Sequence, residues 1–226
     1  MLIVLEGLDG AGKSTQVKMI SEYLQSLGKS VHYLHFPRFE APVVGEMIAR
    51  FLRGDFGPIE SVHPMLVALL FAEDRRDAAQ QMRQALSRGE VVLLDRYVYS
   101  NIAFQCAKLP EPEAVSLRDW IFNTEYGDFA IPRPDLNLFL DVPLSFVDRK
   151  LKEERTGEDR AYLQGKSDIH EADIRFQQQV RQVYLDQCRL DATFERVDCS
   201  DDQGQMLDPQ RIFAKIKTRL DLMIGV

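Results

Sequence analysis

A glycine-rich segment near the N-terminus carries the residue types that bind a nucleoside triphosphate. Residues 7–14 fit the pattern G-x-x-x-x-G-K-[ST], and they lie between a short apolar run and a helical pattern. In that setting backbone N–H groups surround phosphate oxygens, and the positive end of the helix dipole points at the same place. We expect Lys13 to reach the β and γ phosphates and the Ser14 hydroxyl to ligate Mg²⁺. The predicted triphosphate-binding residues are Gly7, Leu8, Asp9, Gly10, Ala11, Gly12, Lys13, Ser14 and Thr15.

A second polar pair follows another apolar run. Asp95 and Arg96 come directly after residues 91–94. A carboxylate at the end of a strand beside a phosphate loop can hold Mg²⁺ directly or through water, and an adjacent arginine can bind phosphate. The sequence therefore predicts a metal site formed by Ser14 and Asp95. A switch GTPase is disfavoured, because the base-reading motif Asn-Lys-x-Asp occurs nowhere in the chain.

A phenylalanine and an arginine share one face of a predicted helix. Phe71 and Arg75 are four residues apart, so the ring and the guanidinium project from the same side. A stacked base with a hydrogen-bonding fork would explain the pair. Spacing alone favours a simpler interpretation, in which Phe71 belongs to the core and Arg75 is its solvated neighbour.

The elements that must position these residues are short strands and long helices in alternation. Apolar runs predict strands at Leu2–Leu5, Val31–Phe36, Val91–Leu94, Leu136–Leu140 and Thr193–Val197. Helical spacing predicts a first helix that stops at Gly28, and further helices over Leu66–Arg88 and Gln177–Leu190. Strands separated by helices imply parallel crossovers, and therefore an α/β fold.

A segment of different composition interrupts this alternation. Between Arg149 and Lys166 charges crowd together, two glycines occur and the apolar periodicity fades. We interpret residues 149–166 as a lid over the site. Since no repeat, low-complexity tract or long linker divides the chain, we expect residues 1–226 to form a single domain.

The composition limits the classes of protein that remain. The 226 residues are 45% hydrophobic and 28% charged, which is typical of a folded globular chain. The net charge of −7 argues against a broad nucleic-acid surface. The longest uncharged stretch, 12 residues at Ser61–Ala72, is too short to span a membrane. Three irregularly spaced cysteines, Cys106, Cys188 and Cys199, predict neither a disulfide framework nor a zinc site, so we expect a cytoplasmic protein.

Five segments, in this order, resemble the thymidylate kinase family: Glu6–Gln16, Phe36–Arg38, Leu69–Arg75, Asp95–Ser100 and Arg133–Leu136. Many activities share the phosphate loop, whereas the third and fourth segments are much narrower signals. The resemblance implies a P-loop NTPase fold, with a doubly wound parallel five-stranded sheet flanked by helices and a lid. It also implies transfer of the γ-phosphoryl group of ATP to dTMP, with Mg²⁺ as cofactor, in a homodimer.

The resemblance also implies roles for individual residues. Phe71 would stack on thymine, and Arg75 would hydrogen-bond the edge of the base. Asp9 would contact the sugar 3′-hydroxyl near the acceptor phosphate, and Arg96 would bind that phosphate. The remaining residues implied for the dTMP site are Phe36, Arg38, Leu52, Ser100, Asn101 and Gln105.

The loop residue Gly10 bears on the source of catalytic charge. Some members of the family carry arginine at this position. This chain carries glycine there, so it resembles the members in which the lid supplies an arginine. The implied catalytic residues are therefore Lys13, Asp9, Arg96, Arg155 and Arg160. Residues 168–171 resemble the segment that resumes the helix after the lid. His32, His35, His63 and His170 lack metal-ligand spacing, and we interpret all four as structural.

Two rival functions remain open. A deoxynucleoside kinase shares the phosphate loop and the strand-end acid and arginine, but it phosphorylates an uncharged hydroxyl and needs a carboxylate base there. A nucleotide-dependent partner or partitioning ATPase would couple hydrolysis to association. The acidic charge balance argues against a version of that ATPase that binds DNA.

Overall fold

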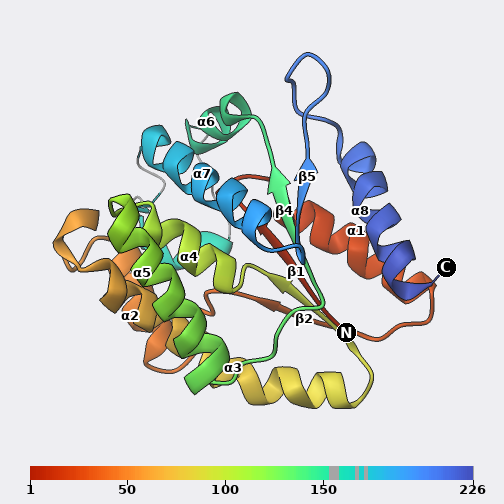
Figure 1. Ribbon diagram of the computed structural model, residues 1–226, viewed down its shortest axis with the longest axis horizontal. Coiled ribbons are helices and arrows are strands. Elements are labelled where there is room, and N and C mark those ends of the chain that lie inside the picture. Colours follow the sequence, from red (N-terminus) through yellow and green to blue (C-terminus); the bar gives the residue numbers. More distant parts are fainter. Residues whose placement is uncertain (153–157, 166–167, 171–172, 226) are drawn as a thin grey trace.

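The computed structural model describes residues 1–152, 158–165, 168–170 and 173–225. Its centre is a sheet of five parallel strands in the order β2-β3-β1-β4-β5 (Figure 1). The strands are β1 (Leu2–Gly7), β2 (Val31–His35), β3 (Val91–Asp95), β4 (Leu136–Asp141) and β5 (Phe194–Asp198). All five predicted strands are confirmed, with boundaries that move by one or two residues.

Burial explains why the central strands read as continuous apolar runs. β1, β3 and β4 are buried along their whole length, because helices cover both faces of a parallel sheet. β2 lies at one edge and is more exposed. Since all strands run in one direction, their carboxyl ends meet at the same edge of the sheet, which is where α/β sheets bind ligands.

Helices cover both faces of this sheet. They are α1 (Lys13–Ser26), α2 (Val44–Leu52), α3 (Pro64–Ser87), α4 (Val98–Cys106), α5 (Glu111–Phe122), α6 (Leu144–Lys152), α7 (Ile174–Leu190) and α8 (Pro209–Ile224). α1 and α8 pack together on one face, whereas α3, α4 and α7 lie on the other (Figure 1). α2 packs on α3, α5 on α4 and α6 on α7. The doubly wound fold implied by the sequence is confirmed.

Two of the predicted helix ends are made by glycine. Gly28 follows α1 with a φ of 74°, and Gly89 follows α3 with a φ of 76°. These are left-handed values that residues with a side chain rarely adopt. The third predicted helix is also present as α7, but it begins at Ile174, three residues before the predicted start.

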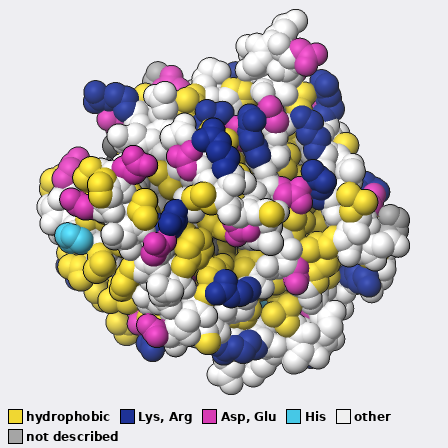
Figure 2. All heavy atoms as spheres, viewed as in Figure 1, with side chains coloured by type: hydrophobic (Ala, Val, Ile, Leu, Met, Phe, Trp, Pro, Cys, Tyr) yellow, Lys and Arg dark blue, Asp and Glu magenta, His cyan; other side chains and the backbone are white. Residues whose placement is uncertain are grey.

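The main apolar core fills the space between the sheet and the helices. A smaller cluster joins α2 to α3 and consists of Ile48, Phe51, Leu52 and Val67. Other large hydrophobic side chains stay exposed, and Figure 2 shows such atoms gathered at the left of the view, where Figure 1 places α2 and α5. Among the helices within the described ranges, none is long and apolar enough to cross a membrane.

Candidate active site

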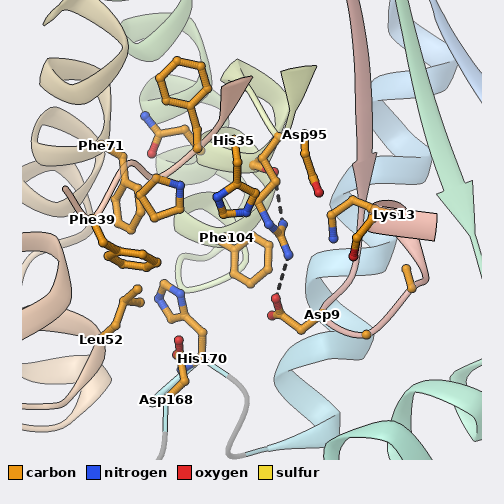
Figure 3. A pocket seen from close by; sticks show the side chains of 18 of the residues that line it. Asp9, Lys13, His35, Phe39, Leu52, Phe71, Asp95, Phe104, Asp168 and His170 are labelled. Atoms are coloured by element: carbon orange, nitrogen blue, oxygen red, sulfur yellow. Dashed lines mark hydrogen bonds and ion pairs between the residues drawn. The ribbon is translucent and has the colours of Figure 1, made fainter. Parts of the chain in front are cut away.

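A cavity of about 390 Å³ opens at the carboxyl edge of the sheet. Its walls come from the phosphate loop, the ends of β2 and β3, the helices α2, α3 and α4, and described residues between 162 and 170. Figure 3 shows Phe71, Phe39 and Leu52 on one side of the cavity, with Lys13 and Asp95 on the other. The sequence-predicted residues that line it are Asp9, Gly10, Ala11, Gly12, Lys13, Ser14, Phe36, Leu52, Phe71, Arg75, Asp95, Arg96, Ser100, Asn101 and Gln105.

The phosphate loop has the geometry of an anion site. Gly10 and Gly12 have φ values of 73° and 79°, which the loop needs in order to turn into α1. Lys13 is buried, and its Nζ donates hydrogen bonds to the backbone oxygens of Gly7 at 3.3 Å and Leu8 at 3.0 Å. Burial and the nearby Arg96 charge lower the pKa of Lys13 to about 8. A phosphate would therefore find a desolvated cation at the start of a helix.

Asp95 ends β3 beside this loop. Its Oδ1 atom is buried and has no hydrogen-bond partner among the described residues. Ser14 is exposed and lines the same cavity. A buried carboxylate oxygen that binds nothing costs free energy, and carboxylate and hydroxyl oxygens are ligands that Mg²⁺ accepts. The residues predicted for the metal are therefore chemically suited to it.

Arg96 forms the centre of a polar network next to Asp95. Its Nη2 donates to Asp9 Oδ1 at 2.6 Å, and its Nη1 donates to Ser100 Oγ at 3.2 Å. Its guanidinium also lies 5.1 Å from the centroid of the Phe104 ring. The backbone φ of Arg96 is 68°, an uncommon value for a residue with a side chain and one that is often found at functional sites.

Asp9 is the acid that holds Arg96 in this position. Burial alone would raise its pKa, but the Arg96 and Lys13 charges outweigh burial, so the pKa of Asp9 is lowered from its ordinary value. The second carboxylate oxygen accepts a hydrogen bond from Gln177 Nε2 at 3.0 Å. Asp9 is therefore ionised near neutral pH and fixed at both oxygens.

Glu6 anchors the start of α4 and was not predicted. Its Oε1 accepts the backbone N–H groups of Tyr97 at 2.9 Å and Ser100 at 3.1 Å, and its Oε2 accepts the hydroxyls of Ser100 and Tyr184. Burial raises the pKa of Glu6 even though these hydrogen bonds and Arg96 oppose the shift. The fully buried carboxyl thus fixes the turn that carries Arg96.

A buried ion pair lies at the other end of the cavity. Arg75 donates from Nε to Glu125 Oε2 at 2.5 Å and from Nη2 to Oε1 at 2.7 Å. Burial opposes the charge of Arg75, but Glu125 raises its pKa above the ordinary value. Asn101 donates from Nδ2 to the same Oε1 at 3.0 Å and to the Ala68 backbone oxygen at 2.9 Å. The polar groups at this end are thus fixed in direction.

Aromatic side chains form the wall between α2 and residues 162–170. The rings of Phe39 and Tyr162 stack with centroids 3.8 Å apart, and the Tyr162 hydroxyl donates to Asp168 Oδ2 at 2.7 Å. Asp168 Oδ1 accepts the backbone N–H of His170 at 2.8 Å. Described residues 168–170 therefore form a turn, and α7 begins only at Ile174. The prediction that residues 168–171 resume the helix is thus wrong for residues 168–170.

Two histidines that we interpreted as structural line the cavity. They are His35, at the end of β2, and His170. Lys108 Nζ lies 3.2 Å from His170 Nε2, within hydrogen-bond distance. Burial and the Lys108 charge hold the pKa of His170 well below its ordinary value, and burial also lowers the pKa of His35. Both rings are therefore neutral near pH 7 and contribute uncharged surface to the cavity.

Arg38 does not reach the cavity. Its Nε donates to Asp74 Oδ1 at 2.9 Å and its Nη2 donates to Asp77 Oδ2 at 2.7 Å. These two acids, three residues apart on α3, hold the guanidinium in a neighbouring hollow that also includes Ser14 and Asp95. Arg38 is therefore absent from the wall of the first cavity, and its role at the dTMP site stays a prediction. Gly7, Leu8 and Thr15 of the loop also lie outside the cavity wall.

The predicted lid is described in part. Its 3-10 segment η3 (Glu158–Leu163) supplies Tyr162 to the cavity wall. Arg155 and the side chain of Arg160 lie outside the described residues. Three arginines were predicted to be catalytic: Arg96, Arg155 and Arg160. Among them, the described part of the chain gives side-chain contacts for Arg96 alone.

Glu6, Glu125 and Gln177 are among the residues of the site network that escaped the sequence reasoning. A lone carboxylate inside an apolar strand, as at Glu6, is a signal that could have identified it. Glu125 and Gln177 give no such signal, because their partners Arg75 and Asp9 lie 50 and 168 residues away in the chain. Only the folded chain shows which of its many polar residues meet.

Comparison with known proteins agrees with this geometry. A family model described as Thymidylate kinase matches residues 5–207. The thymidylate kinase of Mycobacterium tuberculosis is 38% identical over 188 residues, which cover 82% of this chain and 85% of that relative. The Homo sapiens thymidylate kinase is 36% identical over 144 residues, which cover 64% of this chain and 62% of that relative.

A solved structure shows the same likeness in three dimensions. The structure of thymidylate kinase from Candida albicans matches with a TM-score of 0.75 and 26% identity, and the match covers 98% of this chain and 91% of that chain. The family model covers well over half of the sequence. The chain therefore belongs to the thymidylate kinase family.

Proposed function

We propose that this chain transfers the γ-phosphoryl group of ATP to dTMP and releases ADP and dTDP. The observation that carries the proposal is a single cavity that joins the phosphate-loop cation, Lys13, to a buried polar pair, Arg75 and Asn101. Arg96 lines the same cavity. Membership of the thymidylate kinase family supports the same reaction.

The chemistry needs charge and position more than a strong base. The nucleophile is an already ionised phosphate oxygen of dTMP, so no deprotonation has to precede attack. The protein must hold two polyanions in line and offset their repulsion. Lys13 would bind the β and γ phosphates of ATP, and Arg96 would bind the acceptor phosphate. The ion pair with Asp9 keeps the Arg96 guanidinium directed into the cavity.

We also infer that Mg²⁺ accompanies ATP at the phosphate end. The unpartnered Oδ1 of Asp95 and the hydroxyl of Ser14 support this assignment, since both present oxygen ligands on the same cavity wall. When bound, the ion would neutralise charge on the β and γ phosphates. Asp95 and Ser14 would hold it in place on the side of the cavity that contains Lys13.

The opposite end of the cavity fits a pyrimidine base. Thymine would stack on Phe71, and its O4 would accept from Arg75 Nη1, which has no hydrogen-bond partner among the described residues. The N3–H group of thymine would donate to Asn101 Oδ1, which is also unpartnered in the described part of the chain. The other proposed dTMP contacts are Asp9, Phe36, Leu52, Ser100 and Gln105.

We propose that residues 149–166 act as a lid on the one domain that the chain forms. Tyr162 supports this role, because it belongs to the segment and lines the cavity. Gly10 places no side chain over the phosphates, so an arginine of the lid, Arg155 or Arg160, would supply charge to the transferring group. Closure would also exclude water that competes with dTMP.

We further propose a homodimer in the cytoplasm. Exposed apolar side chains at Met47, Phe56 and Leu66 support an association surface around α2 and the start of α3. Cys106 and Cys199 are free and buried, which fits a reducing compartment. Analytical ultracentrifugation at micromolar concentration would measure the oligomeric state directly.

A panel of acceptors tests the proposed reaction. Purified protein with Mg-ATP should phosphorylate dTMP better than dUMP, dCMP or dAMP, and ADP and dTDP should form in equal amounts. Activity on thymidine with no activity on dTMP would instead indicate a deoxynucleoside kinase. ADP formation at the same rate with no acceptor present would indicate an ATPase.

Phe71→Ala should raise the KM for dTMP and leave the KM for ATP unchanged. The lost stacking is worth about 1 to 3 kcal/mol, which corresponds to roughly a fivefold to 150-fold rise. Phe213→Ala is a matched control, because Phe213 on α8 is also half-buried but packs against Tyr23 of α1, outside the cavity. An unchanged KM for dTMP in Phe71→Ala would assign that ring to the core.

A further inference from the structure

Glu125 is a buried carboxylate behind the base end of the cavity. It lies in the π-helical segment Asn123–Asp128, its side chain is 0% exposed, and it is absent from the cavity wall. Its Oε1 accepts hydrogen bonds from both Arg75 Nη2 at 2.7 Å and Asn101 Nδ2 at 3.0 Å. One oxygen of Glu125 therefore holds both of the side chains that would read the base.

The acceptor-only chemistry of a carboxylate fixes the direction of Asn101. The two hydrogens of Asn101 Nδ2 go to Glu125 and to the Ala68 backbone oxygen, which is 2.9 Å away. If the amide flipped, its Oδ1 atom would face two acceptors. Oδ1 is therefore the polar atom of the amide that neither Glu125 nor Ala68 binds. It has no hydrogen-bond partner within the described ranges.

Glu125 fixes Arg75 in the same way. Its Oε2 accepts from Nε and its Oε1 accepts from Nη2, so the guanidinium plane cannot rotate without breaking two charge-assisted hydrogen bonds. Nη1 has no hydrogen-bond partner among the described residues, so it stays available to a ligand. The pair as a whole presents one acceptor, from Asn101, next to one donor, from Arg75.

We propose that Glu125 is a positioning residue that sets the preference of this enzyme for thymine over cytosine. An acceptor next to a donor complements N3–H and O4 of thymine. The same pair opposes cytosine, which has an unprotonated N3 and an amino group in place of O4. The inference rests on the proposed function, because it assumes that the pyrimidine occupies this end of the cavity.

Glu125→Gln separates this role from a purely structural one. The amide has the size of the carboxylate, but in either orientation its NH₂ group must face an N–H of Arg75, so at least one of the hydrogen bonds that fix the guanidinium is lost. We expect the ratio of kcat/KM for dTMP to kcat/KM for dCMP to fall at least about tenfold. Most of the change should come from a higher KM for dTMP, and the KM for ATP should not change.

Asp141→Asn is the matched control. The Asp141 side chain is 1% exposed and accepts from Arg181 and Arg196, each at 2.6 Å, so this substitution also weakens a buried ionic network. Asp141 lies outside the cavity wall. Its substitution should lower the melting temperature and leave the ratio of dTMP to dCMP efficiency at the wild-type value.

A wild-type ratio in folded Glu125→Gln protein would overturn the proposal, whatever the loss in stability. If circular dichroism shows that this variant is unfolded, Glu125→Asp decides, because it keeps the charge but is too short to hold both partners. A rise of at least about tenfold in the KM for dTMP would then support the proposal, and a wild-type KM would overturn it. Wild-type protein that fails to phosphorylate dTMP would contradict the proposed function instead.

Discussion

Replacing Arg96 with alanine should reduce kcat by about a hundredfold to a thousandfold, measured at saturating ATP and dTMP. The guanidinium lines the cavity and would bind the acceptor phosphate while charge builds up between the two substrates. Its removal also deprives Asp9 of the ion pair that lowers its pKa. A bare carboxylate would then face the acceptor phosphate, so the variant loses an attraction and gains a repulsion.

Arg96→Gly distinguishes loss of the side chain from distortion of the backbone. At a φ of 68°, alanine is strained and glycine is not, so Arg96→Gly should be more stable than Arg96→Ala by about 1 kcal/mol in urea unfolding. Both variants should be equally inactive, because both lack the guanidinium. Arg88→Ala, on the exposed end of α3, should retain full activity. Recovery of activity in Arg96→Gly would contradict the assigned role.

The parts of the site that the sequence predicts well are made of neighbouring residues. The phosphate loop is one continuous segment, so its pattern and its position between β1 and α1 define it without any long-range contact. Asp95 and Arg96 are predictable for a similar reason. They follow a buried strand, and in a parallel sheet that position lies at the same edge as the loop.

The parts that the sequence could not predict depend on pairing across the fold. Spacing alone placed Phe71 in the core and Arg75 in solvent, but Glu125 makes it possible to bury the guanidinium completely. Arg38 follows the segment that enters the cavity, but the acids on α3 bind it elsewhere. His170 lies beyond the charged segment 149–166, and its place in the cavity wall follows from the turn at Asp168. None of these outcomes follows from composition or local pattern.

Replacing Lys13 with methionine should reduce kcat by about a hundredfold to a thousandfold without a loss of stability. The activity should fall because the β and γ phosphates lose their desolvated cation. The stability should hold because the folded chain lowers the pKa of Lys13 from 10.5 to about 8. The charged form is therefore disfavoured by folding at neutral pH, and methionine removes that penalty while filling the same space. A large drop in melting temperature would show that Lys13 is structural.

The same pKa predicts opposite pH trends for activity and stability of the wild-type chain. In the free enzyme Lys13 loses its proton above about pH 8, so kcat/KM for ATP should fall about tenfold per pH unit beyond that point. Over the same range the charged form of Lys13, which folding disfavours, gives way to the neutral form. The free energy of unfolding of the wild-type chain should therefore rise relative to that of Lys13→Met. The rise should end where the lysine of the unfolded chain titrates, near 10.5. Lys13→Arg stays charged throughout and should lack the alkaline fall in kcat/KM. A wild-type profile that stays flat from about pH 7 to about pH 9.5 would show that Lys13 keeps its proton when it meets ATP.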